Sequence, residues 1–324
     1  MRSAAKLFLL LTALLFCLPA TGQKKDSFFS DLSDFLDMRE DKAYAKLDSN
    51  YIGRYPYHWN VWTFANTSGM HLTSTFDDAT ELLCGPVNRV GVGVSYRGVG
   101  FTYSHRLGKR RNTEITFSSY SKHFCFEYVL RATSDLKGDV ADNLVLFSSN
   151  LNLFYSFNSR FSYAAAMKQS EIQRRSAGSL ITAVSWSVWD MLFLDPENRI
   201  TSFYEQNYFY QRFSIGAGYG YNWVLGRQHW LFHLSLVPSW TVYEMRALRW
   251  ESDRELKNYP YGYITCMGTA RAGIHFLWAK RWSLGLSGVT NQMLSANRFS
   301  SKKPDFQYFW GQEWQANLTL TFRF

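Results

Sequence analysis

The sequence contains few cysteines, and beyond its first residues it has no long apolar run. The cysteines downstream of residue 22 are Cys84, Cys125 and Cys266, and neither a CxxC pair nor a histidine cluster accompanies them. This pattern argues against a disulfide framework and against a zinc site, although one incidental disulfide fits an oxidising compartment. No later segment supplies the run of about 20 apolar residues that a spanning helix needs. We therefore expect the mature chain to have no helical membrane anchor.

Catalytic and nucleotide-binding motifs are missing as well. The chain has neither a GxSxG elbow nor an HExxH helix. No helical pattern follows Gly91–Gly93, so glycines within a strand explain this segment better than a nucleotide fingerprint. We expect no catalytic residue, no cofactor and no bound metal. The alternative, a lipid-modifying barrel enzyme, would need a serine near His105, His123, His233 or His275 at one rim.

The N-terminus has the pattern of an export signal. Arg2 and Lys6 are basic, Leu7–Leu18 is an apolar run, and Ala20–Gly22 offers small residues for cleavage. The apolar run is too short to span a membrane as a helix. We predict a signal peptide over residues 1–22 and export of the rest of the chain.

The composition fits a chain that meets both lipid and water. Aromatic residues make up 18% of the 324 residues, yet the mean hydropathy is only -0.25. Half of each strand of a membrane barrel contacts hydrocarbon and half contacts a polar interior, which produces this combination. The formal net charge is +9. For an exported chain we attribute this charge to solvated turns and to anionic lipid head groups, and we expect no nucleic-acid partner.

From about residue 57 the apolar residues recur with a period of two. The clearest example is the C-terminal segment, where the alternating apolar residues are Trp314, Ala316, Leu318, Leu320, Phe322 and Phe324. The opposite face of most such segments carries Gly, Ser, Thr and Asn, which suit a confined, wet interior. We predict an all-β fold, a closed antiparallel transmembrane β-barrel of about 12 strands, within a range of roughly 10–14. A soluble secreted β-sandwich is the alternative.

The segments predicted as strands lie near residues 87–96, 98–107, 113–120, 122–133, 149–158, 161–170, 178–189, 207–223, 230–243, 261–277, 281–291 and 312–324. Residues 57–76 could add a hairpin. Short turns at 224–229 and 279–281 alternate with longer connections, as in outer-membrane barrels. However, the same alternation places the long 134–148 connection on the rim of short turns. One predicted strand between 120 and 190 must therefore be wrong.

Residues 23–56 differ from the rest of the chain. Their apolar residues recur at helical spacing between acidic ones: Phe28, Phe29, Leu32, Phe35 and Leu36. This spacing predicts a short amphipathic helix, in a segment that is either periplasmic or a plug at the barrel mouth. An ordered leader with no further role is the alternative. The barrel itself is expected to span residues 57–324.

Tryptophans flank the short turns. Trp223 and Trp230 enclose one turn, and Trp278 and Trp282 enclose the basic turn 279–281. Indole rings prefer the membrane interface, where one edge is apolar and the other is wet. We predict that these four residues form an aromatic girdle, with core tryptophans near hairpins as the alternative.

The chain ends on Phe322 and Phe324, which lie on the apolar face of the last alternating strand. A terminal aromatic residue on such a strand is similar to the signal that barrel-assembly machinery recognises in outer-membrane proteins. We predict that these two residues are an assembly signal and that the assembly machinery is a partner during biogenesis. The other expected partners are outer-membrane lipid and lipopolysaccharide, and the barrel is expected to be a monomer.

Four short motifs carry a resemblance to a known family. They are residues 161–179, the glycine-rich segment 216–221, Asn88 before Gly91–Gly93, and Asp48–Ile52. With these motifs the chain resembles an outer-membrane β-barrel family of unknown function (domain of unknown function 4421) from Bacteroides-type bacteria. The resemblance covers most of the mature chain. It implies a barrel and an envelope location, and it implies no activity.

Charged residues of the 161–179 segment and of two strands could form a cluster in the lumen: Lys168, Glu171, Arg174, Arg175, Arg212 and Arg271. Such a cluster could select anions at a constriction, with Arg174 or Arg175 as the charged element. A salt-bridged network that holds the barrel shape is the simpler alternative. We predict an outer-membrane barrel, either a narrow pore for small polar solutes or a structural or surface-interaction barrel.

Overall fold

The computed structural model describes residues 27–45, 47–74, 80–108, 112–121, 123–134, 136–137, 144–193, 206–250, 257–258, 264–296 and 308–324. The predicted signal peptide, residues 1–22, lies outside the described residues. The chain divides into two compact units, Met1–Lys42 and Ala43–Phe324. The first contains most of helix α2, Ser27–Tyr44, so the predicted short N-terminal helix is confirmed.

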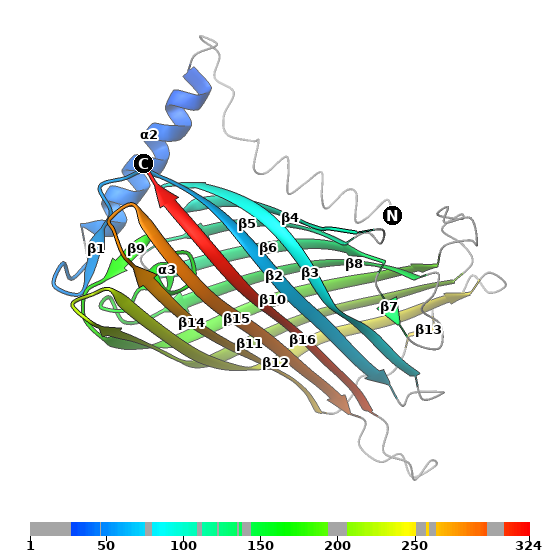
Figure 1. Cartoon of the computed structure of the whole chain (residues 1–324). Helices are drawn as coiled ribbons and strands as arrows, with labels where there is room; N and C mark the ends of the chain where they lie inside the picture. The colour runs from blue at the N-terminus through cyan, green and yellow to red at the C-terminus, as the bar shows by residue number, and fades with distance from the viewer. Residues whose placement is uncertain are drawn as a thin grey trace. The chain divides into compact units, whose positions relative to one another are not determined.

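The second unit contains a closed antiparallel barrel of 12 strands (Figure 1). Its strands are β2 Trp59–Ser74, β3 Thr80–Tyr96, β4 Val99–Arg106, β5 Asn112–Tyr120, β6 Phe124–Thr133, β8 Leu144–Ser156, β10 Ala177–Phe193, β11 Gln206–Leu225, β12 Trp230–Trp250, β14 Ile264–Leu277, β15 Trp282–Ala296 and β16 Tyr308–Arg323. Each strand pairs with the next, and β16 pairs with β2 from Arg323↔Asn60 to Phe309↔Ser74. The predicted closed barrel is confirmed, and the alternative of a β-sandwich is wrong.

Two strand predictions were wrong, and their errors cancel in the count. Residues 161–170 contain helix α3, Tyr163–Met167, which is capped by Ser162 and contains three alanines in succession. Alanine is the strongest helix former, and it outweighs the short alternation there. Residues 57–76 contribute one strand, β2, instead of a hairpin. With these corrections β6 ends and β8 begins at the end of the barrel opposite the C-terminus, so the conflict in loop positions disappears.

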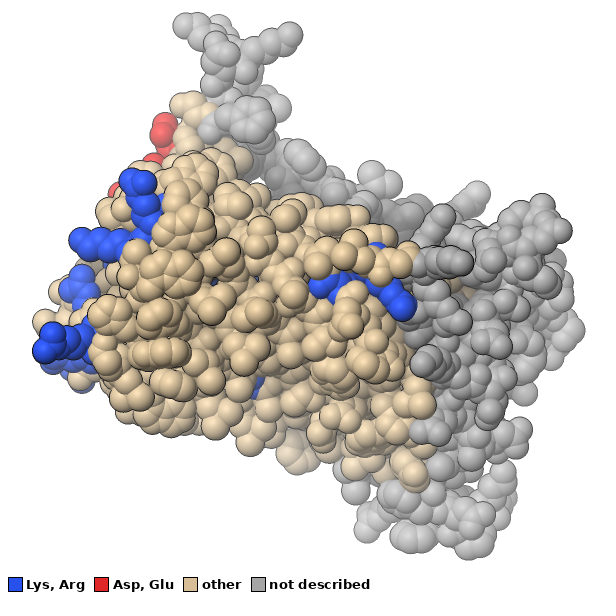
Figure 2. Space-filling model, viewed as in Figure 1, with Lys and Arg blue, Asp and Glu red and all other residues tan. Residues whose placement is uncertain are grey.

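The outer face of the wall is apolar over most of its length. Its exposed large apolar side chains include Val61, Val92, Phe101, Phe117, Leu180, Ile215, Leu234, Leu236, Ile274, Leu286, Leu318 and Leu320. Figure 2 shows this wall largely free of charge, with Lys and Arg gathered at its left end and a smaller group farther right. An uninterrupted apolar belt of this size is stable only against hydrocarbon or another apolar surface. Among the described residues, no helix is long and apolar enough to cross a membrane.

Residues 157–176, here called the plug, connect β8 to β10 and fold inward. They contain α3 and the short strand β9, Glu171–Gln173, which pairs with β1, Ile52–Arg54. Phe161 is fully buried, and wall residues from β11, β14 and β16 bond to the plug. Figure 1 shows α3 and β9 at the end of the barrel where the C-terminus lies.

The opposite half of the interior holds an apolar cluster instead of an open lumen. Its members are Met70, Leu72, Cys84, Val87, Leu146, Trp189, Met191, Tyr210, Met293 and Phe309. Tyr210 contacts both Trp189 and Phe309, with ring centroids 5.2 and 5.6 Å apart. These side chains lie on the inner face, toward the loop ends of their strands. The barrel is therefore filled from both ends.

Glycines on the inner face of β3 make room for aromatic rings from β2. A Cβ atom at Gly93 would lie 2.2 Å from the Trp62 ring, and one at Gly91 would lie 2.3 Å from the Phe64 ring. Because any larger residue would collide with these rings, the glycines serve packing at this point of the wall. The three cysteines of the described residues, Cys84, Cys125 and Cys266, are free.

We predict that Leu318→Arg destabilises the protein in lipid vesicles by about 2–4 kcal/mol, the cost of an arginine near the bilayer midplane. Leu318 is 50% exposed and lies in the apolar belt. Denaturant titration in vesicles measures the effect, and Leu318→Phe is the matched control because it keeps the site apolar. Equal stability of both variants would contradict a lipid-facing wall.

Candidate functional site

Asn222 on β11 ties two parts of the plug together. Its Nδ2 donates to the Ser162 carbonyl at 2.8 Å and to Gln173 Oε1 at 3.1 Å. The same Gln173 oxygen accepts the Ser162 backbone N–H at 2.8 Å. One wall residue therefore holds both the start of α3 and strand β9, and because Asn222 is fully buried, water does not compete for these bonds.

His275 on β14 and Arg323 on β16 hold the other end of the plug. His275 accepts from Gln169 Nε2 at 2.6 Å and donates to the Ala166 carbonyl at 2.5 Å. Arg323 donates to the Gln169 carbonyl and to Ser283 Oγ, each at 2.8 Å. The carbonyls that α3 leaves unpaired at its C-terminal end thus find donors on the wall.

Asn222, His233 and Ser235 form a chain of hydrogen bonds beneath the plug. His233 Nδ1 donates to Asn222 Oδ1 at 2.7 Å, and Ser235 Oγ donates to His233 Nε2 at 3.0 Å. The order matches that of a nucleophile, its base and an orienting group. However, all three residues are buried, Asn222 is engaged with the plug, and Tyr163 packs edge-on against His233. The geometry favours an anchoring role for this chain of bonds.

Two further histidines considered for a lipid-modifying enzyme bond elsewhere. His105 contacts Thr113 Oγ1 at 2.8 Å, and His123 contacts the Ser156 carbonyl at 2.6 Å. Neither bond brings a serine hydroxyl to a histidine, so these contacts do not support that alternative.

A cavity of about 170 Å³, here called the chamber, lies between the plug and the apolar cluster. Met167 and Lys168 border it on the plug side. Its charged lining residues are Glu114, Glu127, Arg131, Lys168, Arg212, Arg271 and Glu313. Asparagine, glutamine, serine and threonine side chains provide most of the remaining lining. The chamber is therefore polar, although apolar side chains fill the half of the barrel beyond it.

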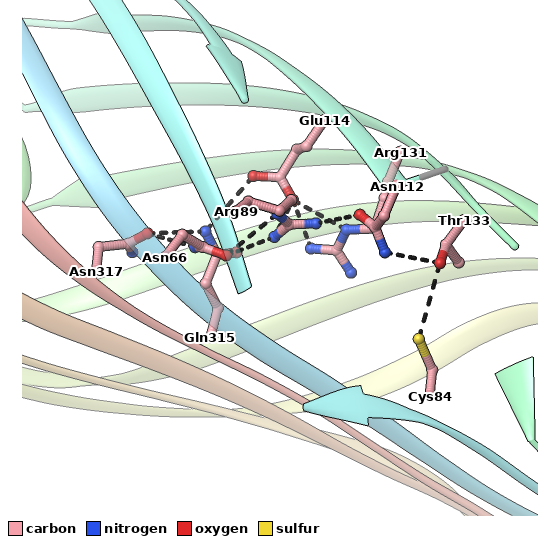
Figure 3. A network of polar contacts seen from close by, with 9 residues as sticks. All are labelled: Asn66, Cys84, Arg89, Asn112, Glu114, Arg131, Thr133, Gln315 and Asn317. Carbon is pink, nitrogen blue, oxygen red and sulfur yellow. Dashed lines mark hydrogen bonds and ion pairs between the residues drawn. The ribbon is translucent and has the colours of Figure 1, made fainter. Parts of the chain in front are cut away.

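Glu114 on β5 is the centre of a buried polar network (Figure 3). Its Oε2 lies 2.7 Å from Arg131 and 3.0 Å from Arg89. Arg89 also donates to Asn66 Oδ1 and Asn112 Oδ1, each at 2.8 Å. The network links β2, β3, β5 and β6, so it braces the wall where the interior is otherwise hollow. One carboxylate serves two guanidinium groups here, and burial makes each of these contacts strong.

A second ion pair crosses the interior between β6 and β14. Arg271 lies 2.6 Å from Glu127 Oε2, and Tyr120 donates to the other carboxylate oxygen of Glu127. The Arg271 guanidinium also lies 4.6 Å from the centroid of the Phe154 ring. Because β6 and β14 are not neighbours in the ring, this pair connects opposite parts of the wall.

The structure places three of the predicted cluster residues at the chamber: Lys168, Arg212 and Arg271. Arg271 pairs with Glu127 as described. Burial lowers the pKa of Lys168, and the nearby Glu127 carboxylate opposes this shift. The three cations reach one cavity from the plug, β11 and β14, which no spacing along the sequence reveals.

The other three residues of the predicted cluster lie elsewhere. Glu171 is buried in the plug and accepts from Ser162 Oγ at 2.5 Å. Arg174 and Arg175 are exposed, and Arg174 donates to the Ser49 carbonyl at 2.9 Å. Neither arginine lines the chamber, and the expected role of either as a charged element in the lumen stays a prediction.

The charged residues of the interior that were missed from the sequence include Arg89, Glu114, Glu127 and Arg131. Each lies on the polar face of an alternating strand, so strand parity could have placed it inside the barrel. Parity alone does not pair one with another, because that depends on which strands face each other across the lumen.

The predicted girdle residues Trp223, Trp230, Trp278 and Trp282 are all exposed at the end of the barrel where its termini lie. Trp278 and Trp282 stack with centroids 6.3 Å apart, and Trp282 contacts Phe322 at 4.6 Å. Phe324 is also exposed and lies next to Phe322. The placement fits an interfacial belt. The assembly role of the two phenylalanines stays a prediction.

The region that contains most of the barrel and the plug matches the model of a protein family. The family model described as "Domain of unknown function (DUF4421)" matches residues 46–311. The chain belongs to this family. The expected Bacteroides-type origin stays a prediction. No curated protein sequence matches the chain.

Solved structures with a similar trace are outer-membrane barrels. The outer membrane protease OmpT from Escherichia coli is 9% identical, with a TM-score of 0.39 over 83% of this chain and 97% of that one. The toluene transporter TodX from Pseudomonas putida is 8% identical, with a TM-score of 0.31 over 83% and 90%. The translocator domain of the autotransporter NalP from Neisseria meningitidis is 8% identical, with a TM-score of 0.30 over 92% and 98%. At these scores none of the three indicates an activity for this chain.

We predict that Glu114→Gln destabilises the barrel by about 3–5 kcal/mol, because it leaves the buried Arg89 and Arg131 without their carboxylate. Asp48→Asn is the matched control. It breaks the exposed pair with Arg160, whose side chain is 56% exposed, and should cost about 1 kcal/mol or less. Denaturant titration of both variants measures the difference. A loss at Glu114 no larger than that at Asp48 would show that the network does not brace the wall.

Proposed function

We propose that this protein is an outer-membrane β-barrel that is closed at rest and passes small polar solutes when the plug moves. The observation that supports this most directly is the plug itself. A chain segment between two wall strands lies in the lumen, and polar bonds to the wall hold it there. Behind it lies a polar chamber, which a purely structural barrel would not need.

The membrane location rests on the wall. The apolar belt requires hydrocarbon around it, and the exposed tryptophans mark one edge of that hydrocarbon. Single-chain barrels with an even number of strands and a predicted export signal are typical of the bacterial outer membrane. On this proposal the end with short turns, termini and plug faces the periplasm. Lipid, lipopolysaccharide and the assembly machinery are the proposed partners of a monomeric barrel.

Closure at rest follows from what fills the interior. The plug occupies one half, and Trp189, Tyr210 and Phe309 belong to the apolar cluster in the other half. Water does not wet a narrow apolar constriction readily, so such a cluster hinders ions even where a gap exists. Phe161, Tyr163 and Ala164 of the plug pack in an apolar cluster with wall residues, and the polar anchors of the plug are hydrogen bonds, each contributing only about 0.5–1.5 kcal/mol net. A few such bonds can break together without unfolding the wall.

Single-channel recording in planar bilayers tests the proposal. We expect rare conductance steps from the wild-type protein and frequent steps from the double variant Asn222→Ala/His275→Ala, because it removes two anchors of the plug. A variant in which a short Gly-Ser linker replaces residues 159–175 and in which Trp189, Tyr210 and Phe309 are changed to alanine should stay open, because both fillings of the interior are then reduced. Arg175→Ala is the matched control, since this residue is exposed, and its recordings should match those of the wild type.

Two results would contradict the proposal. Frequent steps from the wild type would show that the barrel is open at rest. Silence from the linker variant, once a heat-dependent gel shift has shown it to be folded, would show that the barrel is a structural element instead of a pore.

A further inference from the structure

Positive charge exceeds negative charge along the chamber wall. The lining contains the cations Arg131, Lys168, Arg212 and Arg271 and the carboxylates of Glu114, Glu127 and Glu313. Glu114 also serves Arg89, which is buried, and Glu127 is taken up by Arg271 and Tyr120. Glu114 and Glu127 are therefore already engaged in ion pairs, and Lys168 and Arg212 are the lining cations that these pairs do not include.

Arg212 is the cation with the poorest set of partners. It is 3% exposed. Its Nη2 contacts Met267 Sδ at 3.1 Å, and its Nη1 has no hydrogen-bond acceptor among the described residues. Thioether sulfur is a weak acceptor. A buried guanidinium without a good acceptor is unfavourable, so a bound ligand that supplies an acceptor would stabilise this site.

Glu244 does not fill this role. It is the cross-strand neighbour of Arg212, yet no ion pair joins the two side chains among the contacts of the described residues. Arg212 borders the cavity, whereas Glu244 does not.

Lys168 adds a second positive charge from the plug side. Its Nζ lies 5.9 Å from the Tyr120 ring centroid and 6.0 Å from that of Trp62. Ring faces offer only a weak electrostatic partner at this distance. The chamber volume of about 170 Å³ is close to that of a cavity known to hold a benzene-sized guest. A ligand must therefore be small.

We propose that the chamber binds a small monoanion, a halide or a short carboxylate, against the Arg212 guanidinium and in the positive field of Lys168. As a statement about the solute that passes, this rests on the proposed function. As a statement about binding it stands on the chamber alone. The anion supplies the acceptor that the chain does not, and the asparagine and serine side chains around it can donate to it.

Bromide is the anion tested for binding, and gluconate, which is too large for the chamber, is the reference anion that it replaces. Thermal unfolding of the full-length protein in detergent is followed while bromide replaces gluconate at constant ionic strength. We expect a saturable rise of the unfolding midpoint for the wild type and loss of that rise in Arg212→Met. Arg175→Met, an exposed arginine replaced in the same way, should keep it.

Anomalous diffraction from crystals grown in bromide provides a second measurement that does not depend on a folded variant. A bromide peak in the chamber within hydrogen-bond distance of the Arg212 guanidinium supports the site. A wild-type midpoint that does not saturate with bromide, or a rise of equal size in Arg212→Met, would overturn it. Neither result depends on conductance. A barrel that never conducts can still bind the anion, and one that conducts can still fail to bind it.

Discussion

The pairing of β16 with β2 is the interaction on which the rest of the structure depends. It joins the last strand to the first, so the sheet has no edge and every strand of the ring finds backbone partners on both sides. In hydrocarbon, an unpaired backbone group costs several kcal/mol, and only a closed ring avoids this cost with strands. Closure then forces each strand to show one face to lipid and the other to an enclosed interior. Apolar side chains cover the outside for this reason.

An enclosed interior must be filled, and this barrel fills it in three different ways. The plug occupies the end with the termini, the ion-pair network and chamber lie in the middle, and aromatic and methionine side chains pack at the loop end. The middle layer is the one in which charge is concentrated. Its ion pairs, Arg131 with Glu114 and Arg271 with Glu127, lie between two dry layers, where water screens them little.

The same polar groups serve both the fold and the candidate function. Asn222 and His275 donate hydrogen bonds to backbone carbonyls of the plug, and Glu114 forms ion pairs with two arginines of the wall. Three buried arginines, Arg212, Arg271 and Arg323, each have one nitrogen without an acceptor among the described residues. Arg271 pairs with Glu127 and Arg323 bonds to the Gln169 carbonyl, whereas the hydrogen bond of Arg212 is to the Met267 sulfur. The plug is held both by these polar bonds and by an apolar cluster in which Phe161, Tyr163 and Ala164 pack against wall residues. Movement of the plug would therefore have to break both kinds of contact.

The sequence by itself determined the wall of this protein. The period of two placed Leu318 and Leu320 outside and Thr319 and Thr321 inside, because side-chain direction alternates along any strand whatever it pairs with. It also placed the tryptophans at the rim. Only the tertiary structure decided what the wall encloses. Residues 161–170 alternate weakly enough to pass for a strand, and their helix is held by His275 and Arg323, more than a hundred residues away. Contacts across a lumen leave no period in the chain, so the fold of residues 157–176 inside the barrel could not be predicted from it. The sequence did suggest a lumen cluster with Lys168, Arg212 and Arg271, but not the carboxylates that face them.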